Sequence, residues 1–242
     1  MGPILALDTA TAILSAALVS EGRYWYREID AGLGHSELLM ELADSLLKEA
    51  GFSAGDLDAV ACMKGPGSFT GLRIGFSAAK GMALALDIPL IACPTLDCMA
   101  YPWSVWPGLV IPVIDARKGR FFTALYRGGR RISEEMDAEA GAIGEILLSP
   151  PSLPSPPFLS SPPSAGDPIV LTGPDAPLFL SRLEAAGGVA AELPGRIRMD
   201  PLYRKGRGLE LAVLAKESAI MNNGKGDVYS GPQYLRKSDA EH

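Results

Sequence analysis

A glycine-rich stretch from Lys64 to Gly75 constrains the fold of this chain more than any other part of its sequence. It reads KGPGSFTGLRIG, and it separates a short apolar run at 57–63 from a long apolar segment that ends near Leu86. Pro66 fixes its own φ, while the neighbouring glycines allow positive φ or close approach of another backbone. The pattern predicts a strand, a tight turn and a helix, with Ser68 or Thr70 as the N-cap.

This turn has two interpretations. A helix N-terminus beside a glycine-rich loop can hold an anion. The alternative is a strand-to-helix turn that binds nothing, because the stretch lacks the Gly-Lys-Ser/Thr end of a phosphate loop.

Apolar runs before and after this turn predict a mixed α/β half-domain. The first three strands form an antiparallel meander, and the later part forms a right-handed β-α-β unit with parallel strands. The expected strands are 3–8, 13–20, 23–29, 57–63 and 88–92, and the expected helices are 36–50, 71–87 and 95–101.

The two long helices show more apolar surface than one sheet can cover. Helix 36–50, with Ser36 as N-cap and Gly51 at its end, has an apolar face of roughly 200°. Helix 71–87 has a polar stripe of only about 60°, which contains Arg73 and Lys80. Either the remaining faces are buried within the chain, or a partner covers them.

Three motifs carry a resemblance to a known family. Gly65 to Gly75 (GPGSFTGLRIG), Leu5 to Ala10 (LALDTA) and Pro232 to Arg236 (PQYLR) resemble the TsaB (YeaZ) family. The motif residues of the first are Gly65, Pro66, Gly67, Ser68, Phe69, Thr70 and Gly71.

The resemblance implies a two-lobed α/β fold of the actin-like/Hsp70/sugar-kinase (ASKHA) class with a shortened second lobe. It also implies a non-catalytic subunit for tRNA threonylcarbamoyladenosine modification, which binds the catalytic subunit TsaD together with the ATPase TsaE. The two long helices would join two helices of another chain, either TsaD or a second copy in a homodimer. The interface residues implied are His35, Leu38, Leu39, Leu42, Leu46, Arg73, Ile74, Phe76, Ala78, Ala79 and Met82.

The second half of the chain repeats the opening theme from residue 109. Strands are expected at 109–115, 121–126 and 169–173, and helices at 138–148, 176–186 and 209–221. We therefore expect lobes at 1–108 and 109–242, with a C-terminal helix at about 206–221 that could pack back on the first lobe. The Pro/Ser-rich segment 149–168 predicts a loop insertion.

Nucleotide-binding relatives place an acidic turn at the start of each lobe. Asp8 and Thr9 match this turn in part, and their alternative role is to close the turn with local hydrogen bonds. In the second lobe Asp115 is followed by Arg117 and Lys118, where a relative would carry a glycine. We expect no intrinsic cofactor, although ATP or ADP could bind at an interface with TsaD and TsaE.

Metal sites and nucleophiles lack a recognisable pattern. His35 and His242 are the two histidines, and Cys62, Cys93 and Cys98 form no C-x-x-C pair, so we expect buried thiols and no metal.

Charge and composition limit the partners and the location expected for the chain. The net charge of −6 argues against direct binding to phosphate backbones, so tRNA would be reached only through the complex. Arg73, Lys80 and Asp87 interrupt the apolar segment 71–91, and no basic region precedes the first apolar run. We therefore expect no membrane span, no signal peptide and a cytoplasmic location.

The sequence thus favours a scaffold subunit with no enzymatic activity of its own. Two alternatives stay open: a phosphotransferase or glycoprotease-like enzyme of the same fold, and a homodimeric interaction module.

Overall fold

A computed structural model describes residues 2–148, 166–187, 193–221 and 231. The chain divides into two compact units. The described part of the first unit is 2–98, 205–221 and 231, and that of the second is 99–148, 166–187 and 193–204. The division lies between 98 and 99 rather than at the expected 108/109, and the C-terminal helix belongs to the first unit. Most of the expected insertion and the PQYLR motif lie outside the described residues.

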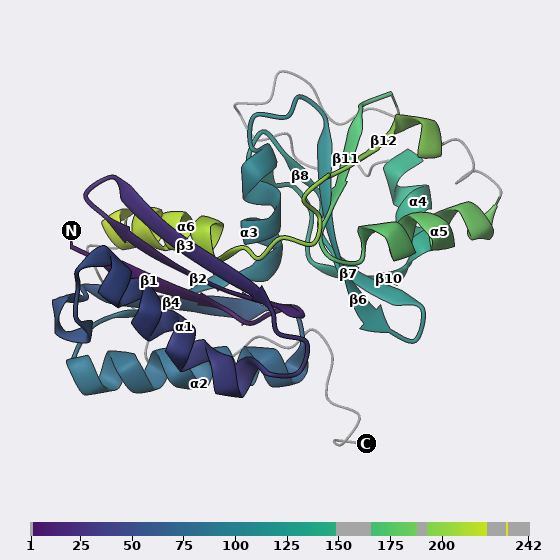
Figure 1. Cartoon of the computed structure of the whole chain (residues 1–242). Coiled ribbons are helices and arrows are strands. Elements are labelled where there is room, and N and C mark those ends of the chain that lie inside the picture. The colour runs from purple at the N-terminus through teal and green to yellow at the C-terminus, as the bar shows by residue number, and fades with distance from the viewer. Residues whose placement is uncertain (1, 149–165, 188–192, 222–230, 232–242) are drawn as a thin grey trace. The chain divides into compact units, whose positions relative to one another are not determined.

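The first unit is built on a five-stranded mixed sheet in the order β3-β2-β1-β4-β5 (Figure 1). β1, β2 and β3 are antiparallel neighbours, whereas β4 and β5 run parallel to β1. This is the predicted meander followed by the predicted β-α-β unit. The strands are β1 (Ile4–Asp8), β2 (Ile13–Ser20), β3 (Arg23–Asp30), β4 (Ala59–Gly65) and β5 (Leu90–Pro94).

Helices cover both faces of this sheet. Leu5 and Leu7 point into the core beneath α1 and α2, while Ile4 and Ala6 point into the core beneath α6. Figure 1 shows α1 and α2 together on one side of the sheet and α6 on the other. The alternating direction of side chains along a strand produces these two cores from one run of apolar residues. The helices of this unit are α1 (His35–Ala50), α2 (Phe69–Leu86) and α6 (Gly208–Met221), with the short 3-10 turn η1 (Ala54–Asp56). Helix α3 (Thr95–Ala100) contains the division between the units, and the 3-10 turn η2 (Tyr101–Trp103) follows it in the second unit.

The helix ends confirm one predicted cap and contradict another. Ser68 accepts a hydrogen bond from the Gly71 amide at 3.2 Å and caps α2, as predicted. Helix α1 begins at His35, with Gly34 at the cap position and no side-chain cap bond, so the prediction of Ser36 as N-cap was wrong. Gly51 ends α1 in the left-handed conformation at φ 77°.

The second unit repeats the strand order of the first. Its sheet has the order β10-β7-β6-β11-β12; in addition, β8 pairs with β6, and β9 pairs with β8. The strands are β6 (Leu109–Arg117), β7 (Arg120–Thr123), β8 (Tyr126–Arg127), β9 (Arg130–Arg131), β10 (Met136–Glu139), β11 (Ile169–Thr172) and β12 (Ile197–Met199). The helices are α4 (Ala140–Leu148), α5 (Ala176–Ala186) and the 3-10 turn η4 (Pro194–Arg196).

The edge strands β10 and β12 were missing from the sequence prediction. Each has three or four residues and no fully buried side chain, so neither shows the apolar alternation that identifies a strand. The interior of the unit is conventional. Phe121 and Phe179 meet edge to face at 5.1 Å in a core shared by α4, α5 and the central strands.

The three cysteines are buried thiols, as predicted. Burial raises the pKa of Cys62 and of Cys93 to about 12, and burial also raises the pKa of Cys98. They therefore behave as small apolar side chains rather than nucleophiles. Among the described helices, none has the length and apolar content needed to cross a bilayer.

Candidate functional site

Helices α1 and α2 bury about half of the residues that the sequence assigned to a partner interface. Leu42 is 6% exposed and Ala79 is 0% exposed, and both lie in the core between these helices and the sheet. The two helices also pack against each other, which accounts for their wide apolar faces. The sequence predicted a partner role for six residues that instead lie in the chain's own core. They are His35, Leu39, Leu42, Leu46, Phe76 and Ala79.

His35 has a specific internal contact. Its Nε2 lies 2.8 Å from the Thr11 carbonyl oxygen, and the ring is buried. The side chain thus ties the start of α1 to the turn between β1 and β2, where the sequence suggested a contact with another chain.

The remaining predicted interface residues keep part of their surface exposed. They are Leu38, Arg73, Ile74, Ala78 and Met82. Arg73 lies over the ring of Phe69, with its guanidinium carbon 3.8 Å from the ring centroid. A partner role for these five residues stays a prediction.

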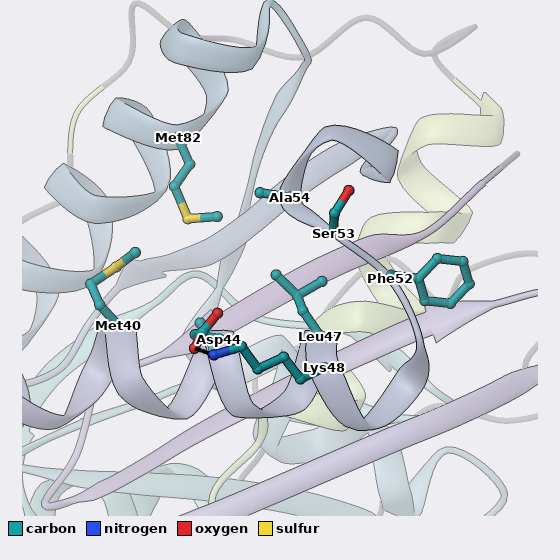
Figure 2. A pocket seen from close by; sticks show the side chains of 9 residues that line it. Met40, Asp44, Leu47, Lys48, Phe52, Ser53, Ala54 and Met82 are labelled. Atoms are coloured by element: carbon teal, nitrogen blue, oxygen red, sulfur yellow. Dashed lines mark hydrogen bonds and ion pairs between the residues drawn. The ribbon is translucent and has the colours of Figure 1, made fainter.

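A groove of about 330 Å³ opens between α1, α2 and the segment 52–54 (Figure 2). Figure 2 shows the side chains of Met40 and Met82 pointing toward one another across it. The segment 52–54 is held against α1 by a 2.9 Å hydrogen bond from the Phe52 amide to the Leu47 carbonyl. The lining residues are Met40, Ala43, Asp44, Leu47, Lys48, Phe52, Ser53, Ala54 and Met82.

The groove is apolar and carries one ion pair. Lys48 Nζ lies 2.6 Å from the Asp44 carboxylate one helical turn away, and both side chains are exposed. Such a pair in water contributes about 0–1 kcal/mol, so it does little to order the surface. The groove therefore offers contact area to apolar side chains rather than charged groups to a polar substrate.

Most residues that line this groove were missing from the predicted interface. Met40 belongs to the apolar pattern of α1 and could have been chosen from it. Phe52, Ser53 and Ala54 come from a loop whose path along α1 depends on the tertiary fold. Only Met82 of the lining residues was among the predicted contacts.

The glycine-rich turn packs directly against the first turn of the chain. The Ser68 amide donates to the Ala10 carbonyl at 2.8 Å, and Thr9 Oγ1 donates to the Gly71 carbonyl at 2.7 Å. A Cβ placed on Gly71 would lie 2.1 Å from the Thr9 carbonyl oxygen, and one on Gly75 would lie 2.2 Å from Thr9 Oγ1. These glycines thus serve close packing of two backbones.

Asp8 is engaged by the protein itself. It is 2% exposed, and it accepts hydrogen bonds from the Ala10 amide at 3.0 Å and the Arg207 amide at 2.8 Å. Ser15 Oγ also donates to it at 3.3 Å and accepts from the Gly208 amide at 2.9 Å. Burial raises the pKa of Asp8, whereas these hydrogen bonds act to lower it. Asp8 therefore fastens the N-terminus of α6 to the β1–β2 turn.

The equivalent turn in the second unit is a tight cationic hairpin. Arg117, Lys118 and Gly119 have φ of 64°, 55° and 77°. Arg117 is 87% exposed, and its amide donates to Asp115 at 2.8 Å. The Asp115 amide in turn donates to Asp175 at 2.8 Å. Loss of solvation raises the pKa of Asp175.

In both turns the aspartate carboxylate accepts hydrogen bonds from the chain itself. Both carboxylate oxygens of Asp8 accept hydrogen bonds from the chain, and bulky residues replace the glycine needed near Asp115. In the part of the chain that the structure describes, no cluster of three His, Cys, Asp or Glu side chains could hold a metal.

Comparisons with known sequences find relatives that are named as TsaB proteins. The chain is 30% identical to the tRNA threonylcarbamoyladenosine biosynthesis protein TsaB of Bacillus subtilis, over 98% of this chain and 96% of the relative. It is 37% identical to TsaB of Escherichia coli, over 51% of this chain and 54% of the relative. A family model described as TsaD, tRNA N6-adenosine threonylcarbamoyltransferase, matches residues 30–157.

Solved structures agree on the fold. A Pseudomonas aeruginosa structure described as similar to peptidase YEAZ has a TM-score of 0.72 at 24% identity, covering 98% of this chain and 100% of that one. Component A of (R)-2-hydroxyglutaryl-CoA dehydratase from Acidaminococcus fermentans has a TM-score of 0.51 at 13% identity, covering 91% and 100%. These similarities establish the expected actin-like α/β fold and nothing about activity.

Proposed function

The chain belongs to the TsaB (YeaZ) family, and from this premise we propose that it is an accessory subunit of tRNA threonylcarbamoyladenosine biosynthesis that binds TsaD. A role in this biosynthesis is supported by the similarity to TsaB along nearly the whole chain. The observation that carries the proposal of docking is the exposed apolar groove between α1 and α2.

The choice of TsaD as partner has a structural argument. The TsaD family model matches residues 30–157, and this range contains both α1 and α2. A TsaD protein is therefore expected to carry an equivalent helix pair. Two related helix pairs can meet as the two halves of a symmetric dimer do, with each presenting the same surface to the other.

A homodimer is the second candidate, and the same surface favours it. An isologous dimer would place the groove of one copy against the groove of another. In the cell the two partners would then compete for one surface. We assign ATP or ADP to TsaD and TsaE rather than to this chain, because its own acidic turns are occupied by internal hydrogen bonds.

Binding measured with matched surface variants tests the proposal. Met40→Glu places a charge at the rim of the groove, whereas Leu178→Glu places one on α5, at a leucine with comparable exposure. In titration calorimetry with cognate TsaD we expect Met40→Glu to weaken binding by about tenfold or more, since burying an unpaired charge is costly. Leu178→Glu should bind like the wild type.

Sedimentation of the chain without TsaD measures its self-association and so tests the homodimer. If Met40→Glu abolishes self-association and leaves TsaD binding intact, the groove belongs to a homodimer and the proposed docking surface is wrong.

A further inference from the structure

Two methionine side chains line the groove that we assign to TsaD. Met40 on α1 is 49% exposed, and Met82 on α2 is partly buried. Figure 2 shows both side chains pointing into the groove, which the buried Leu47 also lines. Because about half of Met40 is exposed in the isolated chain, we expect its side chain to be accessible to small oxidants.

We infer that Met40 and Met82 make TsaD docking sensitive to peroxide, an inference that rests on the proposed function. Hydrogen peroxide transfers one oxygen atom to a thioether: the sulfur lone pair attacks one peroxide oxygen, an S–O bond forms and the O–O bond breaks. Sulfur is oxidised by two electrons, and the departing hydroxide takes up the remaining proton as water. The product is a methionine sulfoxide, which methionine sulfoxide reductases convert back.

A sulfoxide in this groove is poorly matched to a docked partner. Its oxygen is a hydrogen-bond acceptor, whereas Ala43, Leu47 and Phe52 offer apolar side chains. Lys48 is the ammonium group among the lining residues, and it is already 2.6 Å from the Asp44 carboxylate. Docking would remove water from the sulfoxide oxygen, so we expect TsaD binding about ten- to a hundredfold weaker.

The other methionines provide internal references. Met63 and Met99 are buried and should oxidise slowly, whereas Met221 at the end of α6 is 83% exposed and does not line the groove. Met221 should therefore oxidise at least as readily as Met40, without consequence for docking.

The experiment combines oxidation mapping with binding. The purified chain is treated with graded hydrogen peroxide, its sulfoxides are mapped by mass spectrometry, and its affinity for TsaD is measured before and after treatment. We expect affinity to fall with oxidation of Met40, and to return after treatment with sulfoxide reductases. A complex with TsaD should protect Met40 and leave Met221 reactive.

Two variants assign the effect to the groove. For Met40→Leu/Met82→Leu, the ratio of affinities before and after peroxide should be close to one, because leucine keeps the volume and lacks the sulfur. Met221→Leu should lose affinity on oxidation as the wild type does. Loss of affinity in the double variant as well would assign the effect to another residue and overturn the inference.

The two proposals fail in distinguishable ways. If the reduced chain binds TsaD and the chain oxidised at Met40 binds equally well, this inference is wrong and the proposed function stands. If the reduced chain does not bind TsaD, the proposed function is wrong and this inference fails with it.

Discussion

At the scale of single residues, close packing explains why glycine recurs in the motif from Gly65 to Gly75. Gly67 lies just before the N-cap of α2, and Gly71 and Gly75 follow it at four-residue intervals within the helix. All three face the turn at Thr9 and Ala10. A side chain at these positions would meet backbone or buried atoms. The glycines of the motif thus allow the start of α2 to approach the β1–β2 turn closely, although the two segments lie far apart in sequence.

Replacement of Gly71 by alanine tests this interpretation. A Cβ would lie 2.1 Å from the Thr9 carbonyl oxygen, so the two segments must separate. We expect the free energy of unfolding in urea to fall by about 2–4 kcal/mol. Gly81→Ala is the control in the same helix, where no atom lies within 4 Å of the added Cβ. It should stabilise the chain by up to about 1 kcal/mol. Equal effects of the two changes would contradict the packing role of Gly71.

Asp175 gives a prediction for pH. Loss of solvation, with the Asp115 charge in addition, raises its pKa above 3.8 in the folded state. Because the folded state then holds the proton more tightly than the unfolded state, Asp175 stabilises the fold at acid pH. This contribution is lost as pH rises through the folded pKa.

Asp175→Asn removes this titration and can still accept the Asp115 amide hydrogen bond. We therefore expect the wild type to lose stability relative to the variant as pH rises from about 4. Denaturation curves of both proteins across this range measure the difference. A wild type that gains stability relative to the variant with rising pH would show that the folded pKa is lowered instead.

At the scale of elements, α1 separates core from surface within one helical turn. Leu42 packs beneath the helix on the sheet, whereas Met40 faces the groove. The same substitution at the two positions should therefore have different consequences.

Leu42→Glu should unfold the chain or destabilise it by about 4 kcal/mol or more, because it buries a charge with no partner. Met40→Glu should change stability by about 0.5 kcal/mol or less, as expected for an exposed site. Circular dichroism during thermal unfolding measures both. A stable Leu42→Glu chain that no longer binds TsaD would restore Leu42 to the partner interface, as the sequence first suggested.

Most long elements could be predicted from sequence, because their apolar periodicity is local. The helices 36–50 and 71–87 and the strands of the first sheet agree with the structure within a few residues. The interface list was less accurate, since periodicity shows that a face is apolar and not what covers it. The internal role of Leu42, the contact of His35 with Thr11 and the path of the segment 52–54 all depend on contacts distant in sequence.

At the scale of the whole molecule, the two units share a strand order and differ in their helices. Helices α1 and α2 have 16 and 18 residues, whereas α4 and α5 in the second unit have 9 and 11. At about 1.5 Å per residue, the first pair is roughly 10 Å longer than the second. The longer pair carries the apolar groove, so the first unit offers a surface for a partner in addition to its own core.

Reconstituted tRNA modification tests the central claim most directly. Purified TsaD, TsaE and the adenylate-forming enzyme would be supplied with L-threonine, bicarbonate, ATP and unmodified tRNA, with and without this chain. We predict that threonylcarbamoyladenosine forms only when the chain is present, that Leu178→Glu supports it fully, and that Met40→Glu supports it poorly at limiting concentration. Full modification without the chain, or equal support by both variants, would contradict the account.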